Sequence, residues 1–332
     1  MSSEGTLITG RGAIASSAAR YELVWVDRTG RETPVDSTWT FRVTAYGGNA
    51  GWALSPDGGR LAIGLATEAG DDVWIKQLPR GPLSRLTFDP ASEYRPRWEP
   101  DGRSVTFLSN RASTSALFRR PADGTGADDL VLRLPQSLFE AVSSRDGRWL
   151  VVRTGGVQGA AGGRDIFGLR PGADSVPVPL VVTPTFDESA IALSPDGRWL
   201  GYESSESGRT EVYVRPFPNT EAGKWQVSIG GGAAPIWAPG GRELFYVNGA
   251  RQMVAAAVAP GPSLQIGERR VLFRLRDELY LANDEHYTPF DVSPDGRRFI
   301  MARRVRAEAV AATPLIVVQN WFEELNQRLA RR

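Results

Sequence analysis

Short alternating runs of apolar and polar residues recur along the chain, and six of them follow the same kind of four-residue segment. The segment usually has proline second and aspartate third, and it always ends in glycine. This composition predicts a type I turn that ends in a left-handed glycine. Six copies occur: Ser55–Gly58, Glu99–Gly102, Ser144–Gly147, Ser194–Gly197, Ala238–Gly241 and Ser293–Gly296.

The residues four and six places after the third turn position are apolar in every copy, which predicts a strand with one face against a core. These pairs are Leu61 and Ile63, Val105 and Phe107, Leu150 and Val152, Leu200 and Tyr202, Leu244 and Tyr246, and Phe299 and Met301. A large apolar residue also precedes five of the turns: Leu54, Trp98, Leu193, Trp237 and Val292. Ser143 takes this place in the third copy, so we expect that module to be less well packed there.

Most copies continue with a third strand that often begins with an acidic residue, at Asp72, Asp165 and Glu211, and then with a fourth strand. The third turn positions are residues 57, 101, 146, 196, 240 and 295, so the period is 44 to 55 residues. Four strands in such a period form one blade of a β-propeller, and stacked blades bury the faces that one blade leaves open. The sequence therefore predicts an all-β propeller of four-stranded blades.

The number of blades depends on how the chain ends meet. If the hairpin of 22–27 and 32–35 completes the last module, six blades result. If Ser2–Leu7 is a degenerate further copy, there are seven, and 315–318 is a third strand of the last blade. We favour seven blades, with six as the alternative. This gives an N-terminal segment 1–20 that includes a degenerate first-blade strand, a propeller over 21–318, and a tail over 319–332. Trp321, Leu325 and Leu329 predict a short amphipathic helix in that tail.

Composition narrows the function classes. The net charge is +1, so no basic surface points to nucleic acid. Cysteine is absent, which excludes disulfides and thiolate metal sites. No apolar run is long enough to insert in a membrane, and the first twenty residues do not resemble a signal peptide.

Candidate chemistry is sparse. His286 is the only histidine, and no Gly-x-Ser-x-Gly segment accompanies it. Asp57, Asp101, Asp146, Asp196 and Asp295 occupy equivalent turns, which favours a structural role. The glycine runs at 155–163 and 230–232 do not lead from a strand into a helix, so we predict loops and not phosphate sites. Arg209, Arg215 and Trp225 could contact an anion or peptide, although packing explains them as well. We predict no catalytic residue, metal or cofactor, and the ligand-binding residues stay unknown.

The turns and their strands resemble the TolB-type, WD40-like propeller repeats of bacteria. The stretches 207–218, 223–228 and 241–246, with 23–28 near the start and 320–325 near the end, also resemble the C-terminal propeller of bacterial transmembrane serine/threonine kinases. That resemblance implies an extracytoplasmic sensor or interaction module. Kinase activity is not implied, because the chain lacks the Gly-rich loop, Val-Ala-Ile-Lys, His-Arg-Asp and Asp-Phe-Gly motifs.

We therefore expect a non-catalytic module that binds a protein, peptide or small ligand at a propeller face, with a kinase domain in the full-length gene as one setting. The alternatives are the propeller domain of a prolyl-oligopeptidase-type hydrolase and a TolB-like periplasmic accessory protein. The compartment stays open: extracytoplasmic in a membrane kinase, cytoplasmic if the chain is complete as written.

Overall fold

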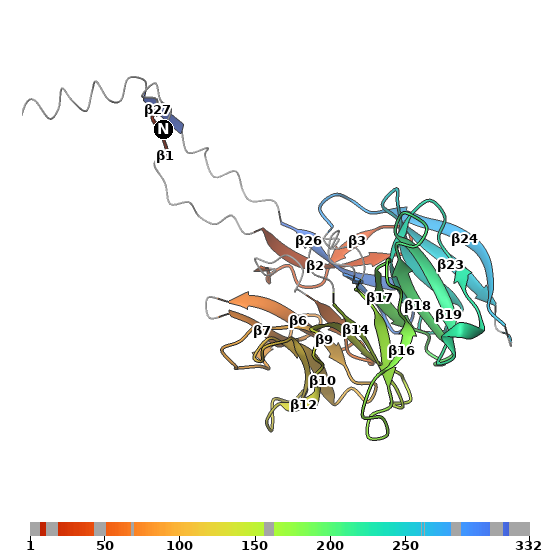
Figure 1. The fold of residues 1–332 in the computed structure, drawn as a ribbon. Helices are drawn as coiled ribbons and strands as arrows, with labels where there is room; N and C mark the ends of the chain where they lie inside the picture. The colour runs from red at the N-terminus through yellow and green to blue at the C-terminus, as the bar shows by residue number, and fades with distance from the viewer. Residues whose placement is uncertain are drawn as a thin grey trace, which may run out of the picture.

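The computed structural model describes residues 7–10, 19–42, 51–67, 70–155, 163–259, 261, 263–279, 287–305 and 315–318. Six antiparallel sheets of four or five strands make up the body of the molecule (Figure 1). Each sheet contacts the next, and β25 (Asp291–Val292) of the last sheet contacts β5 (Trp52–Leu54) of the first. The sheets therefore form a closed ring of six blades, which we number by the order of their turns.

In each of the first three blades, strands that are consecutive in the chain pair with one another and form a simple meander, as a repeated hairpin pattern predicts. The first blade contains β5 (Trp52–Leu54), β6 (Arg60–Thr67), β7 (Gly70–Gln77) and β8 (Leu83–Arg85). The second contains β9 (Glu93–Trp98), β10 (Ser104–Ser109), β11 (Ala116–Pro121) and β12 (Asp129–Leu132). The third contains β13 (Leu138–Ser143), β14 (Leu150–Thr154), β15 (Ile166–Leu169) and β16 (Val178–Val181).

The fourth and fifth blades repeat the meander, and the sixth combines both ends of the chain. The fourth contains β17 (Glu188–Leu193), β18 (Trp199–Ser204), β19 (Glu211–Pro216) and β20 (Trp225–Gln226), with the 3-10 turn η1 (Thr220–Ala222) before β20. The fifth contains β21 (Gly232–Trp237), β22 (Glu243–Asn248), β23 (Gln252–Ala259) and β24 (Gln265–Arg274). The sixth contains β25 (Asp291–Val292), β26 (Arg298–Arg304), β2 (Arg20–Asp27) and β3 (Glu32–Pro34), with β4 (Phe41–Arg42) also on β2.

The preference for seven blades is wrong, and the six-blade alternative is correct. β2 pairs with β26 from Tyr21↔Arg304 to Asp27↔Arg298, so the N-terminal hairpin supplies the third and fourth strands of the last blade. This pairing leaves no incomplete blade for a seventh copy to fill, and it hides the strand edges at the closure of the ring.

Of the proposed degenerate copy, Ser2–Thr6 lie outside the described residues, and the predicted strand at 315–318 does not enter a blade. β1 (Leu7–Gly10) pairs antiparallel with β27 (Leu315–Val318) in a separate two-stranded sheet. The predicted helix of the tail lies outside the described residues. Among the residues that the structure describes, no helix is long and apolar enough to cross a membrane.

The core lies between the blades. The described residues form six apolar clusters, and each is shared by two adjacent sheets. Between the first and second blades, for example, Ile75 packs in the same cluster as Phe107 and Phe118. A lone blade would expose both of these apolar faces, so closure of the ring is what makes the repeats stable.

Candidate binding cup at the turn face

The six predicted turns lie at the end of the ring where each inner strand joins the second strand of its blade. All six close with a hydrogen bond from the glycine N–H to the carbonyl oxygen of the first turn residue, at 2.7 to 2.9 Å. All six glycines have a positive φ, between 66° and 72°. A side chain is strained in that conformation, which explains why glycine is the one residue type common to every copy.

The turn aspartates are held inside their own turns. In four copies the serine hydroxyl donates to the aspartate two residues later: Ser55, Ser144, Ser194 and Ser293 bond to Asp57, Asp146, Asp196 and Asp295 at 2.5 to 2.6 Å. This hydroxyl bond, with a backbone N–H, holds the pKa of the carboxyls of Asp57, Asp146 and Asp295 below their usual range. The structural role predicted for these aspartates matches these bonds.

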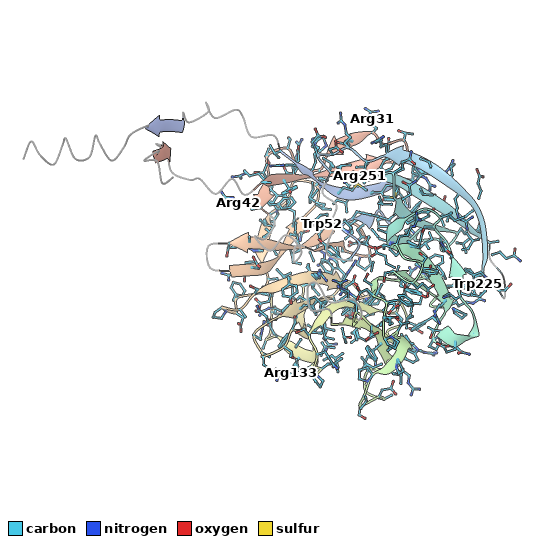
Figure 2. All side chains as sticks on the ribbon, turned by 45° about the horizontal axis from the view of Figure 1, so that its top comes forward. Arg31, Arg42, Trp52, Arg133, Trp225 and Arg251 are labelled. Atoms are coloured by element: carbon cyan, nitrogen blue, oxygen red, sulfur yellow. The ribbon has the colours of Figure 1, made fainter. Side chains whose placement is uncertain are left out.

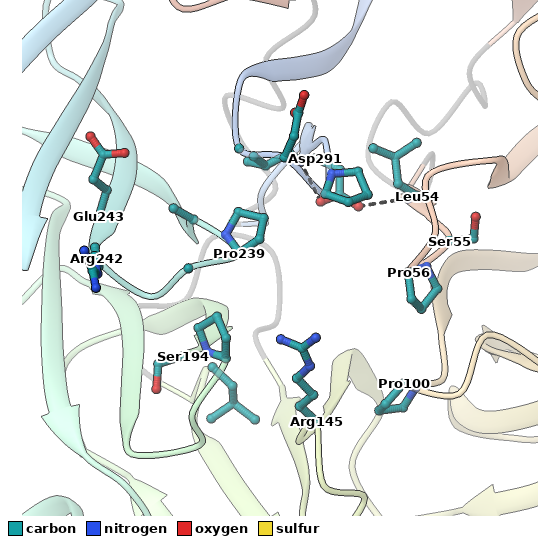
Figure 3. A pocket seen from close by; sticks show the side chains of 18 of the residues that line it. Leu54, Ser55, Pro56, Pro100, Arg145, Ser194, Pro239, Arg242, Glu243 and Asp291 are labelled. Carbon is teal, nitrogen blue, oxygen red and sulfur yellow. Dashed lines mark hydrogen bonds between the residues drawn. The ribbon is translucent and has the colours of Figure 1, made fainter. Parts of the chain in front are cut away.

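The turns surround a cup with a volume of about 810 Å³. One residue at the second turn position of each blade lines it: Pro56, Pro100, Arg145, Pro195, Pro239 and Pro294. Figure 3 shows this cup with the proline rings around it and the Arg145 side chain directed into it. The volume falls in the range of ligand sites in proteins, about 300–1,000 Å³.

Neighbouring turns approach each other more closely in four of the six junctions than in the other two. There, a Cβ added to the glycine of one turn would lie close to Cδ of the proline in the preceding turn. These distances are 3.5 Å for Gly102 and Pro56, 3.8 Å for Gly241 and Pro195, 3.6 Å for Gly296 and Pro239, and 2.9 Å for Gly58 and Pro294. The remaining two junctions flank the Arg145 turn, where a Cβ at Gly147 or Gly197 would meet no atom within 4 Å. The collar of turns is therefore open on both sides of Arg145.

The third blade also differs behind its turn. Trp98 and Trp237 each donate the indole N–H to a carbonyl of the preceding blade, Ala53 at 3.0 Å and Ala192 at 3.1 Å. Ser143, at the same place in the third blade, instead donates its hydroxyl to Glu99 of the second blade at 3.1 Å. A small polar contact thus replaces a large side chain, in agreement with the expected weaker packing.

Three arginines, Arg28, Arg145 and Arg242, and three carboxylates line the cup; of the carboxylates, Asp295 is bound within its own turn. Arg28 is bound by both oxygens of Glu243, at 2.8 and 2.5 Å, and this contact lowers the pKa of Glu243. Arg145 and Arg242 also line the cup, but neither guanidinium has a hydrogen bond or ion pair with the residues that the structure describes. These two cations are available to an anionic group.

Asp291 is the carboxyl on the other side of the cup. Its two oxygens accept the backbone N–H groups of Leu54, at 2.8 Å, and Val292, at 2.7 Å (Figure 3). Burial raises the pKa of Asp291, against the opposing effect of the nearby Arg97 charge. The bond to Leu54 joins the sixth blade to the first, so Asp291 serves the closure of the ring.

Below the cup, side chains of four blades narrow the axis of the ring. A small cavity there has a volume of only about 20 Å³, which is close to the volume needed for one water. The residues that line it include Trp52, Arg95, Glu140 and Tyr287. The guanidinium carbon of Arg95 lies 4.6 Å from the ring centre of Tyr287. Among the described residues, these side chains leave little free space at this level of the ring.

A second cavity, of about 340 Å³, opens at the other end of the fourth and fifth blades, and Arg209 and Arg251 line it. Of the three residues singled out in the sequence, Arg209 lines this cavity. Arg215 donates to Tyr202 at 2.9 Å and to the carbonyl of Thr220 at 3.1 Å. Trp225 packs edge-on against Trp199, with ring centres 5.7 Å apart, and Figure 2 shows it at the outer edge of the molecule.

Near this opposite end, buried charges join the blades. Arg153 is fully buried and donates to Glu140 at 2.8 Å, and Glu140 also accepts the N–H of Ala190 in the next blade. Glu188 is buried between the third and fourth blades, where one of its oxygens has no hydrogen-bond partner. Burial, together with the charge of Asp165, raises the pKa of Glu188 to about 7, although Thr183 and Ser204 donate to its other oxygen.

The sequence candidates are thus separated in space. His286 and the middle of the glycine run at 155–163 lie outside the described residues. The turn aspartates are distributed over different blades, and the described residues contain no group of three or more His, Cys, Asp or Glu that could hold a metal. The residue that sequence analysis missed is Arg145. Its signal was present, since Arg145 is the only non-proline at the second position of the six turns.

No model of a known protein family matches the sequence. Among solved structures, a protein from Agrobacterium tumefaciens described as TolB is similar, with a TM-score of 0.60 and 17% identity; the match covers 88% of this chain and 100% of that chain. TolB from Acinetobacter baumannii gives a TM-score of 0.53 and 14% identity, over 76% of this chain and 65% of that chain. These identities establish the fold alone, and the kinase resemblance stays a prediction. The chain therefore has the fold of a TolB-type β-propeller.

Proposed function

We propose that this chain is a non-catalytic binding module that receives a segment of another polypeptide in the cup at the turn face. The observation that carries the proposal is the cup itself, because all six blades contribute a turn to its lining. Such a site is assembled only when the ring closes, and its rigid proline rim presents apolar surface without a large loss of side-chain entropy on binding.

The geometry favours binding over catalysis. The carboxylates of the turns are occupied by hydroxyl and backbone donors within the same turn. Among the described residues that line the cup there is no histidine or lysine to activate a serine, and the hydroxyls of Ser55 and Ser194 donate to aspartates of their own turns. What the lining does offer is apolar rings, backbone and uncommitted guanidinium groups.

A peptide selection tests the proposal. Random twelve-residue peptides displayed on phage would be selected against the immobilised chain, and the affinity of synthetic copies would be measured by fluorescence anisotropy. We expect peptides that bind in the micromolar range and compete with one another for a single site. Failure to enrich any sequence over an empty support would contradict the proposal.

An activity measurement forms the second arm. The purified chain is expected to show no ATP-dependent phosphorylation and no peptidase turnover. Turnover that disappears in His286→Ala would instead establish a catalytic function.

The biological setting of the module is a separate part of the proposal. Sequence resemblance supports an extracytoplasmic sensor domain of a receptor-like serine/threonine kinase, and the TolB fold supports a periplasmic accessory protein as the alternative. Translation of the DNA upstream of Met1 distinguishes the two settings. A kinase domain and a membrane helix in frame would support the first, and a signal peptide would support the second.

A further inference from the structure

We infer that Arg145 is a specificity residue that binds an acidic side chain of the polypeptide in the cup, through a notch in the collar of turns. The inference rests on the proposed function and adds the chemistry of the partner. The partner is a polypeptide segment with at least one aspartate or glutamate that reaches the Arg145 turn.

Arg145 departs from an otherwise uniform ring. The other five residues at its position are prolines that line the same cup. Its turn nevertheless closes like the others, with the Gly147 N–H bonded to the Ser144 carbonyl at 2.8 Å and a φ of 69° at Gly147. The backbone of this turn does not need arginine, so the fold gives no reason for it.

The notch provides room beside the guanidinium. The two junctions on either side of this turn are the two at which no atom lies within 4 Å of a Cβ added to the glycine. In the four other junctions the Cδ atom of a proline lies 2.9 to 3.8 Å from that position. The gap between neighbouring turns is therefore wider next to Arg145 than at the other junctions, and a ligand side chain could enter there.

Charge complementarity selects the class of side chain. Arg145 is exposed, and it has no partner among the residues that the structure describes. Its own turn neighbour Asp146 accepts the Ser144 hydroxyl and the Arg148 N–H. Arg242 adds a second uncommitted cation to the same cup, whereas Glu243 is neutralised by Arg28. A carboxylate can bind a guanidinium through two parallel hydrogen bonds, which gives both direction and selectivity.

The test compares peptide selection on the wild-type chain and on Arg145→Pro, which gives the third turn the residue of the other five. We expect wild-type peptides to carry an acidic residue at a fixed position, and replacement of that residue by Gln or Asn to weaken binding at least 10-fold. Arg145→Pro should weaken the acidic peptide by a similar factor and leave the amide peptide within 2-fold. Arg145→Lys should retain part of the affinity, because the charge remains.

Two controls keep the outcomes distinct. Arg209→Ala, at the other cavity, should leave the affinity unchanged. Peptide binding is also measured in sodium sulfate and in sodium chloride at the same ionic strength. This comparison distinguishes the binding of a free anion from general screening of charge. If the notch binds anions, we expect sulfate but not chloride to displace the peptide. Selected peptides without an acidic position, or equal affinity of the acidic peptide for Arg145→Pro, would overturn this inference and leave the proposed function standing. Absence of any selected peptide would contradict the proposed function itself.

Discussion

The two ends of the blades use their polar groups in different ways. At the turn face, most polar groups are satisfied within a few residues of the chain, as when the Ser194 hydroxyl bonds to Asp196 and accepts the N–H of Trp199. Toward the opposite end, carboxylates cross to the next blade: Glu140 accepts an N–H from a residue 50 positions away, and Glu203 from one 31 positions away. The first kind of contact repeats with the sequence. In the second kind the glutamate comes from the first strand of its blade in one case (Glu140) and from the second strand in the other (Glu203).

This difference implies separate roles. The turns form a regular frame, and the single departure from it at Arg145 is the observation that supports the binding role we infer for this residue. The buried charges at the opposite end join blades, and their loss should act on stability. The following substitutions test that division, beginning with the largest expected effect.

Removal of one partner of the buried ion pair should be the most damaging change. Glu140→Ala leaves Arg153 buried without a carboxylate and also frees the Ala190 N–H, which we expect to lower the free energy of unfolding by about 3–5 kcal/mol. Urea denaturation followed by tryptophan fluorescence measures the loss. The matched change at the turn face, Arg145→Ala, should cost less than about 0.5 kcal/mol. Similar losses in the two variants would contradict the division of roles.

Glu188 should make stability depend on pH. Its pKa rises from 4.5 to about 7 on folding, so its contribution to stability is complete below about pH 4.5 and is lost as the pH rises through about 7. The isosteric variant Glu188→Gln should remove this decline, a difference on the order of 1–2 kcal/mol between pH 5 and pH 8 after allowance for solvent screening. Denaturation at several pH values gives the curve. Parallel curves for the two proteins would show that Glu188 ionises normally in the fold.

Loss of a turn serine should have a moderate effect. Ser194→Ala removes a hydroxyl that donates to Asp196 at 2.6 Å and accepts the N–H groups of Arg198 and Trp199. We expect a decrease in the free energy of unfolding of about 1–2 kcal/mol, because the buried Trp199 N–H loses an acceptor. An exposed serine such as Ser207 provides the control, and Ser207→Ala should be neutral.

The smallest effect on stability should have the opposite sign. Arg145→Pro is expected to stabilise the chain by about 0.4–1 kcal/mol, because proline restricts the unfolded state and suits the same position in five other turns. Differential scanning calorimetry measures the shift. A clear destabilisation would mean that Arg145 serves the fold, and its assignment as a binding residue would lose its main support.

The same comparison of the two ends explains which features of the fold and the site could be predicted from the sequence. The turns, their glycines and the apolar strands after them depend on neighbouring residues, so they could be predicted from local pattern. Ring closure could not, because the alternatives differed only in which distant strand pairs with β26. The ion pair of Glu140 and Arg153 also escaped prediction, since burial of those side chains depends on the next blade. Arg145 was visible in the repeat, but its importance depends on the open junctions beside it.

The central claim is that this molecule binds its partner at the turn face. A selected peptide that carries benzoylphenylalanine at one position can be crosslinked by light to the wild-type chain, and the attachment site can be identified by mass spectrometry. We predict crosslinks to the residues that line the cup, among them Pro100, Arg145 and Pro195. Crosslinks confined to the cavity lined by Arg209 and Arg251 would contradict the claim.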